Sequence, residues 1–397
     1  MTKDKKSIPQ LKIFLDTNVI HTHTPSELVN SKVSKMIAEH SNSGFLEISW
    51  YISDTVRHER QYQMINGASE WLSYIPKIKK FFEIDFAADE PAINNRVNDL
   101  INEQLKILNL NVFNIQYTQV RWDQIANKAI YRLPPFSTGK NEKGFRDALI
   151  IESFKQFISQ ESNALIVLVS GDKLVRDAAQ SVITSDMRVM PSLIELNVLI
   201  NTLLSQVTED FVTEMKEKAG AIFFIGKDFS TLYFKEKLHE KITERFAQEL
   251  HTKPQNILES EEGDWYVQPP LFLKKKGHRL FWTSRIEPTF TGYKKEFVYQ
   301  PIDPERGPLS LDLERGIMSL DLSNSDQSIS THRGLMGGYP RVPGLMNPGG
   351  FRQEKIMINY SVIFEVNWSV HIDKHKKLTD PKIEEIKYAE VVVRLGA

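Results

Sequence analysis

Short apolar runs alternate with amphipathic segments in the first half of the chain. Helical patterns lie between the apolar runs. One follows Ser53-Asp54, either of which can cap a helix, and another runs from Gly144 to about Gln160. This alternation predicts an α/β fold with a parallel sheet flanked by helices. The runs that predict its strands are Lys12–Asp16, Phe45–Ser53, Asn111–Ile115, Leu165–Ser170 and Met187–Met190.

The second half of the chain begins with helical patterns and then changes character. Helical segments continue to about His251 and include Phe229–Leu250. Beyond them, Tyr266–Tyr299 predicts short strands. The segment Ile356–Ile372 alternates apolar with mostly polar positions, which is typical of a half-buried antiparallel strand. A last strand is predicted at Val391–Leu395.

These patterns predict three parts in chain order. Residues 1–200 form the α/β domain, 201–260 a helical connector, and 261–397 a mainly antiparallel, β-rich accessory domain. The last part contains a Gly/Pro-rich loop at about 301–353. A loop of that length is either functional or disordered.

Four acidic residues lie where predicted elements of the first half begin or end. Asp16 directly follows an apolar strand, and Asp172 follows another through Ser170-Gly171. Asp147 is in the first turn of its helix and shares a face with apolar residues. Glu59 is in an early turn of the helix after Ser53. Because the carboxyl ends of parallel strands meet at one edge, we expect the four acids to converge there.

Converging carboxylates repel one another unless cations lie between them. Hard oxygen ligands suit Mg²⁺ or Mn²⁺ and disfavour zinc or copper. Each acid also has a simpler interpretation. Asp172 can cap the helix Lys173–Ala179, and Asp54 and Glu70 compete with Glu59 as the second acid.

Composition narrows the chemistry further. The 397 residues include no cysteine, which excludes disulfides and thiolate zinc sites. A lone pair such as His21 and His23 in a polar loop is seldom a metal site. The formal net charge of −1 means that a nucleic-acid partner requires a local basic surface. The polar start of the chain and the lack of long apolar runs predict a cytoplasmic protein without a membrane span.

Three segments of the first half resemble the PIN-domain nucleases. They resemble more narrowly the bacterial PIN-like group that has a β-rich C-terminal region. The likeness extends over roughly Leu11 to Leu196. Its motifs are Phe14-Leu15-Asp16-Thr17-Asn18-Val19, Gly144-Phe145-Arg146-Asp147-Ala148-Leu149 and Val169-Ser170-Gly171-Asp172.

The resemblance implies a set of functional residues and a reaction. Its catalytic and metal-binding acids fall on Asp16, Glu59, Asp147 and Asp172, which would hold one or two Mg²⁺ or Mn²⁺ ions. The implied reaction is hydrolysis of phosphodiester bonds, with single-stranded RNA as the expected substrate and 5′-phosphate and 3′-hydroxyl products. The expected supporting residues are Asn18 and Ser170, as hydrogen-bond donors, and Arg146, which either meets a substrate phosphate or pairs with an acid.

Other functions stay open at this point. A PIN-fold module without activity would bind RNA or regulate another protein, and DNA or branched structures are alternative nuclease substrates. The family also suggests a toxin or defence role, an antitoxin or regulatory protein as partner, and assembly into oligomers.

Basic and aromatic residues are interleaved in the first part of the predicted β-rich domain. Lys274, Lys275 and Arg279 lie there among aromatic positions, as on a surface for single-stranded nucleic acid. The alternative is that Trp282 and Ile286 are core residues and the lysines solvate the outer face. Lys143, ahead of Gly144, either forms a basic lip beside the acidic site or belongs to a solvated loop.

Overall fold

The computed structural model describes residues 9–41, 45–83, 89–138, 143–161, 164–184, 186–254, 257, 259–300 and 350–394. The chain divides into two compact units that do not follow chain order. The first comprises Met1–Lys237, Pro269–Ser284 and Val366–Glu385. The second comprises Leu238–Gln268, Arg285–Glu365 and Ile386–Ala397. The three-part division by sequence position stays a prediction.

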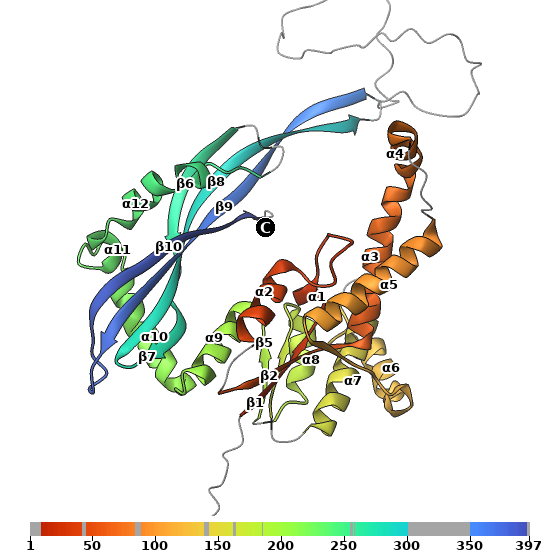
Figure 1. Ribbon diagram of the computed structural model, residues 1–397, viewed down its shortest axis with the longest axis horizontal. Coiled ribbons are helices and arrows are strands. Elements are labelled where there is room, and N and C mark those ends of the chain that lie inside the picture. The colour runs from red at the N-terminus through yellow and green to blue at the C-terminus, as the bar shows by residue number, and fades with distance from the viewer. Residues whose placement is uncertain are drawn as a thin grey trace, which may run out of the picture. The chain divides into compact units, whose positions relative to one another are not determined.

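A five-stranded parallel sheet organises the N-terminal half, in the order β3-β2-β1-β4-β5 (Figure 1). Ile13 of the central strand is opposite Trp50 on one side and Val167 on the other. This arrangement confirms the predicted α/β fold. Its strands are β1 Gln10–Leu15, β2 Glu47–Ser53, β3 Leu110–Phe113, β4 Leu165–Val169 and β5 Met187–Met190.

Helices flank this sheet, so its central strand is buried on both faces. Leu11, Ile13, Phe14 and Leu15 have no exposed surface, as expected for a covered parallel sheet. The helices are α1 Thr17–Ile20, α2 Ser31–His40, α3 Asp54–Ser69, α4 Ile75–Phe82, α5 Glu90–Ile107, α6 Trp122–Ile130, α7 Phe145–Gln160, α8 Lys173–Gln180 and α9 Leu193–Leu204, with short 3-10 helices η1 Glu70–Ser73 and η2 Tyr117–Gln119.

A second five-stranded sheet, antiparallel, lies in the C-terminal part of the chain, as predicted. Its main order is β10-β9-β8-β6, and β7 also pairs with β8. The strands are β6 Glu259–Val267, β7 Leu271–Lys276, β8 Arg279–Gln300, β9 Gly350–Ile372 and β10 Leu378–Arg394. Before them come the helices α10 Glu209–Phe223, α11 Leu232–Lys235, α12 Leu238–Arg245 and α13 Ala247–Leu250.

The prediction of short strands within Tyr266–Tyr299 is wrong for β8, which is a single strand of 22 residues. β8 continues through two residue types that usually break strands, Pro288 and Gly292. Pro288 pairs opposite Trp265, next to a break in the β6–β8 register. Gly292 lies where a Cβ would come within 2.7 Å of the Ile257 side chain, so the missing side chain makes room for a packed neighbour.

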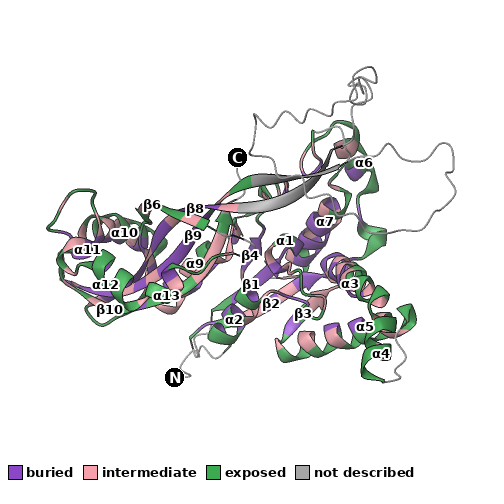
Figure 2. Cartoon of the chain, turned by 90° about the horizontal axis from the view of Figure 1, so that it is seen from above, coloured by how far each residue is buried: buried purple, intermediate pink, exposed green. Residues whose placement is uncertain are grey.

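The alternating segment of β9 is buried on its apolar side only from Tyr360 onward, since Ile356 is 37% exposed and Ile358 is half-buried. Figure 2 shows β9 buried along much of its length. The buried residues of the apolar side include Tyr360, Val362, Phe364, Val366, Trp368 and Val370. The polar side is more buried than the pattern indicated, because Ser361 and Ser369 are buried too. The guanidinium of Arg279 donates to the Ser369 hydroxyl from 2.9 and 3.1 Å and covers it.

Two sequence predictions fall outside the described residues. These are the Gly/Pro-rich loop up to residue 349 and the last position of the strand predicted to end at Leu395. Within the described part of the chain, no helix is long and apolar enough to cross a membrane.

Candidate active site

The parallel sheet brings two of the predicted acids to neighbouring strand ends. Asp16 follows the last residue of β1, and Asp172 comes shortly after β4, which pairs with β1. The backbone N–H of Asp16 donates to the Val169 carbonyl of β4 at 3.1 Å. Glu59 lies in an early turn of α3, which follows β2, the other neighbour of β1. Asp147 lies in the first turn of α7.

Asp16 is almost completely buried, with 2% of its surface exposed. Its Oδ1 caps α1 by accepting from the Thr17 N–H at 2.6 Å. Its Oδ2 accepts from the Ser170 hydroxyl at 2.5 Å and from the Asn18 amide at 2.9 Å. Asn18 and Ser170 therefore both contact the carboxylate they were expected to support.

Burial raises the pKa of Asp16 to about 6. The hydrogen bonds from Ser170 and Thr17 oppose this rise in pKa, whereas the negative charges of Asp147 and Glu59 add to it. The carboxylate is thus well held by donors and still costly to ionise.

Glu59 is held from two sides. Its Oε2 accepts from the Thr17 hydroxyl at 2.8 Å, and its Oε1 forms an ion pair with Arg146 of α7. Of the two roles expected for Arg146, contact with a phosphate or pairing with an acid, the structure has the second. Ser53, rather than Asp54, caps α3, because its hydroxyl accepts from the Val56 N–H at 3.1 Å.

Asp147 lies in the electric field of the other acids. Its pKa is raised to about 6, mainly by burial and also by the charges of Asp172 and Glu59, whereas the charge of Arg146 opposes the rise. The four carboxyl groups thus form one linked set: Asp147 interacts with Asp16, Glu59 and Asp172, and Asp16 with Glu59. Several interacting negative charges therefore lie at this sheet edge.

Asp172 also caps a helix, as its simpler interpretation stated. Its Oδ1 accepts from the N–H groups of Leu174 at 2.7 Å and Val175 at 3.4 Å at the start of α8. Both capping bonds use Oδ1, so capping leaves Oδ2 to other partners. The Asp172 N–H donates to the Ser170 hydroxyl at 3.1 Å, which connects it to the group that binds Asp16.

Gly144 fixes the start of α7 and hence the position of Arg146 and Asp147. Its φ of 120° lies in the region that favours glycine, and an added Cβ would come within 2.6 Å of the Pro135 carbonyl oxygen. It would also come within 2.7 Å of the Phe136 Cα. This close backbone approach explains why glycine begins the segment.

The family model of the PIN domain matches residues 13–174, which include all four acids. The chain carries a PIN domain. A PIN domain is a nuclease-like fold that often works with divalent metal ions. No curated protein matches the chain, and no solved structure matches it either.

The donor chemistry of the PIN-domain acids fits a hard divalent cation, because all four offer carboxylate oxygens. Two of them, Asp16 and Asp147, have the raised pKa values that a nearby cation would lower. The four carboxylates are, however, more widely spaced than the ligands of a formed metal site. Within the described residues, no three His, Asp or Glu side chains are clustered as a metal site. Glu59 instead faces Arg146, and Asp172 caps α8.

Thr17 and Arg60 are site-supporting residues that the sequence analysis missed. Arg60 is 1% exposed, and its guanidinium donates to the carbonyls of Leu28 at 3.0 Å and Glu27 at 2.8 Å. It anchors the loop after α1 to α3, beside Glu59. A detectable signal exists, because Arg60 is spaced four residues from buried Val56 and from buried Met64.

The histidine pair His21 and His23 contributes to packing in the PIN domain. Their rings are 4.9 Å apart in an edge-on arrangement. Nδ1 of His21 lies 3.1 Å from the Arg60 guanidinium and 3.1 Å from Oε1 of Gln63, so the ring packs into the polar contacts of α3. Neither histidine belongs to a metal-binding group among the described residues.

The predicted nucleic-acid contacts in the β-rich region have partners within the protein. Arg279 donates to the Asp380 carboxylate and backbone carbonyl, each at 2.9 Å. Lys274 lies 5.3 Å from the Phe281 ring centroid and Lys275 5.6 Å from that of Phe211. Trp282 and Ile286 are fully buried, which confirms them as core residues. Nucleic-acid binding by these basic residues, and by exposed Lys143, stays a prediction.

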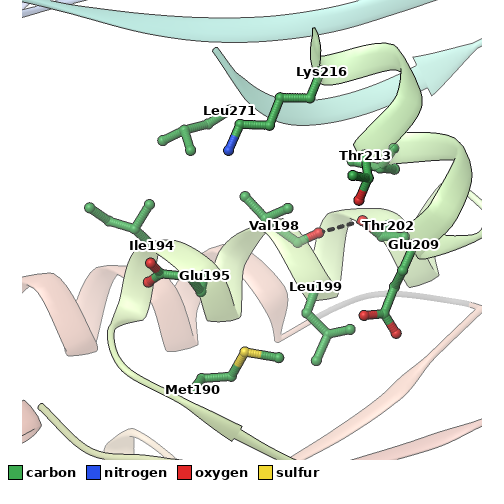
Figure 3. A pocket seen from close by; sticks show the side chains of 11 residues that line it. Met190, Ile194, Glu195, Val198, Leu199, Thr202, Glu209, Thr213, Lys216 and Leu271 are labelled. Carbon is green, nitrogen blue, oxygen red and sulfur yellow. Dashed lines mark hydrogen bonds between the residues drawn. The ribbon is translucent and has the colours of Figure 1, made fainter. Parts of the chain in front are cut away.

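A cavity of about 230 Å³ lies apart from the four acids, between α9 and α10 (Figure 3). Its walls are mainly apolar, with Leu271 of β7 among them. The charged side chains of Glu195, Glu209 and Lys216 line it as well. The Thr202 hydroxyl is already bonded to the Val198 carbonyl at 2.7 Å. The cavity thus contains none of the predicted catalytic residues.

Proposed function

We propose that this protein is a metal-dependent endonuclease that hydrolyses phosphodiester bonds in single-stranded RNA. The observation that carries the proposal is the electrostatic linkage of Asp16, Glu59, Asp147 and Asp172 at one sheet edge. Asp16 is buried and Glu59 and Asp147 are half-buried, so holding these acids close together raises the free energy of their charged forms, which a bound cation would lower. The PIN-domain match supports nuclease chemistry in general.

Each acid has a proposed role in holding Mg²⁺ or Mn²⁺. Asp16 is the central ligand, since donors fix its carboxylate in one orientation. Glu59 follows the strand on one side of β1 and Asp172 the strand on the other, and the carboxyl group of Asp147 interacts with both. When bound, the metal supplies an activated water and stabilises the charge on the leaving oxygen. The expected products carry a 5′-phosphate and a 3′-hydroxyl.

Arg146 and Thr17 hold Glu59 in place before substrate binds. The Thr17 hydroxyl keeps one Glu59 oxygen directed toward α1, next to Asp16. Arg146 is 63% exposed in its side chain, so it is accessible to a phosphate while it remains beside Glu59. An Arg in this position suits contact with the phosphate next to the scissile bond.

One observation favours a second candidate, a PIN-fold module that binds RNA without cutting it. Glu59 is neutralised by Arg146 and Asp172 caps a helix, so two of the four acids have structural partners. A nuclease for DNA or for branched structures is a further alternative, because recognition of the 2′-hydroxyl leaves no readable motif.

The deciding experiment is a cleavage assay with single-stranded RNA, duplex RNA and single-stranded DNA, each with Mg²⁺, Mn²⁺ or chelator. We expect metal-dependent cleavage, fastest on single-stranded RNA, and its loss in Asp147→Asn. The matched control is Asp177→Asn, an exposed acid on α8 outside the linked set. Cleavage by Asp147→Asn at the parent's rate contradicts the active-site assignment. Binding without any cleavage by the parent supports the second candidate.

A further inference from the structure

Three large aromatic side chains are exposed where β3, α6 and α7 begin or end, beside the acidic site. Tyr117 begins η2 after β3, Trp122 begins α6, and Phe145 begins α7. Their exposed fractions are 48%, 45% and 54%. Rings of this size normally bury most of their surface, so three of them exposed near one sheet edge call for an explanation.

The three residues form one surface. The rings of Trp122 and Phe145 are stacked, with centroids 6.5 Å apart and planes 19° from parallel. The Trp122 indole N–H donates to the Tyr117 carbonyl at 3.2 Å. The rings are not themselves the local core, since a separate cluster of buried side chains fills that role. Its members are Ile115, Val120, Ile125, Phe136 and Ala148.

The aromatic surface lies at the same edge of the parallel sheet as the acidic site. The strand order β4-β1-β2-β3 arranges the residues after each strand in the order Asp172, Asp16, Asp54, Tyr117. Burial raises the pKa of Tyr117, and the nearby negative charge of Asp54 adds to the rise. Phe145 directly precedes Arg146, which pairs with Glu59, so the first turn of α7 carries both the aromatic surface and the link to the acids.

The charge around the aromatic surface suits a phosphate backbone. Within the described part of 117–152, the basic residues outnumber the acids, and one of those acids is Asp147 itself. The basic residues are Arg121, Lys128, Arg132, Lys143 and Arg146, and the acids are Asp123, Asp147 and Glu152. The surface of α6 is largely exposed to solvent (Figure 2). Positive charge with exposed rings is the combination that binds single strands.

We propose that Trp122 and Phe145, bordered by Tyr117, stack against an unpaired base of a nucleic-acid strand whose phosphate lies at the four acids. The inference rests on the proposed nuclease function and adds the reason for a single-stranded substrate. A base in a duplex is already stacked on both faces, whereas an unpaired base has a face available to the rings. Stacking of this kind tolerates any base.

The test pairs protein variants with a defect in the substrate. The assay compares three full-length proteins: the parent, Trp122→Ala and Phe145→Ala. Each is given two labelled single-stranded RNAs of the same sequence, one intact and one with single abasic positions near the cut. For the parent, we expect an abasic nucleotide beside the cut to lower kcat/KM roughly ten- to a hundred-fold. Each variant should lose a similar factor on intact RNA, mainly through KM, and should no longer distinguish the two RNAs.

Two further variants separate stacking from structure. Phe145→Tyr keeps a ring and should restore cleavage, whereas Phe145→Leu keeps an apolar side chain and should not. Phe45→Ala removes a 69% exposed ring just before β2, at the opposite edge of the sheet from the acids, and should match the parent. Full activity of Phe145→Leu, or equal discrimination against abasic RNA by parent and Trp122→Ala, overturns the proposal.

Failure of the nuclease proposal remains distinguishable from failure of this inference. If the parent cuts nothing with any metal, the proposed function fails, and binding of the same two RNAs is measured with chelator present. Tighter binding of intact RNA by the parent, lost in Trp122→Ala, then supports the stacking surface without catalysis. Equal binding of both RNAs overturns the stacking surface as well.

Discussion

The two sheets of this protein handle charged side chains in opposite ways. In the parallel sheet, every strand ends at the same edge, so Asp16 after β1 and Asp172 after β4 come to one edge, and the carboxyl group of Asp147 interacts with both. In the antiparallel sheet, neighbouring strands run in opposite directions and charges pair across them, as Arg285 does with Glu365 at 2.9 Å. Parallel topology concentrates like charge, which a binding site can use, whereas the antiparallel sheet neutralises charge locally.

Asp16→Asn is expected to have the largest effect on cleavage, because it removes the most constrained carboxylate at the acidic edge of the parallel sheet. Cleavage should fall by about a thousandfold or more, since the central metal ligand is lost. Arg285→Ala, which breaks a locally neutralised pair, should change cleavage by less than about threefold. Steady-state kinetics under saturating Mg²⁺ measure both. If Asp16→Asn and Arg285→Ala lost similar amounts of cleavage activity, the two sheets would not differ in their importance for the reaction.

Gly144→Ala and Gly277→Ala compare backbone constraint in the two regions. Both glycines have positive φ, 120° and 58°, but only Gly144 has backbone atoms within 3 Å of an added Cβ. We expect Gly144→Ala to lower the free energy of unfolding by about 2 to 4 kcal/mol and to slow cleavage. Gly277→Ala should cost only about 1 kcal/mol. Urea unfolding gives both values, and a cost at Gly144 no larger than at Gly277 would contradict the close approach.

The pH dependence of stability tests the charge concentration itself. The pKa of Asp16 is about 6 in the folded protein and 3.8 as its ordinary value. The folded state therefore binds more protons between about pH 4 and 6, and the free energy of unfolding falls as pH rises through that range. With chelator present, Asp16→Asn should lessen this fall by about 2 to 3 kcal/mol.

Thermal unfolding of parent and Asp16→Asn at pH 4.5, 6 and 7.5 provides the comparison, because other titrating groups are common to both proteins. Added Mg²⁺ at pH 7.5 should raise the Tm of the parent more than that of the variant. Identical pH profiles for the two proteins would show that Asp16 ionises without cost.

Sequence patterns predicted the two sheets better than they predicted contacts within the site. The strands of the parallel sheet are buried on both faces, so they appear as short apolar runs, and the acids that follow them are readable. The pairing of Arg146 with Glu59 joins residues in two helices far apart in the sequence, and no local pattern records it. The choice of Ser53 over Asp54 as the cap depends on one hydroxyl reaching the Val56 N–H, which either residue type allows.

The long strand β8 shows why breakers mislead. Pro288 and Gly292 argue for strand ends when read locally, yet a register break and a packed neighbour accommodate them. The buried position of Arg60 was missed because a charged residue is usually expected to be exposed to solvent, even when its neighbours at helical spacing are buried. In each case a residue far along the chain supplies the deciding partner.

Lys274→Glu combined with Lys275→Glu has the smallest expected effect and tests whether the antiparallel sheet also binds nucleic acid. Both lysines follow the register break in β7 and lie beside aromatic rings. We expect RNA affinity to fall only a fewfold, with the slope of log affinity against log salt reduced by about one to two. The control is Lys382→Glu, which disrupts a surface pair with Asp380. If the double variant binds as tightly as the parent at every salt concentration, these lysines only solvate the sheet, and the acidic edge with its aromatic surface carries nucleic-acid binding alone.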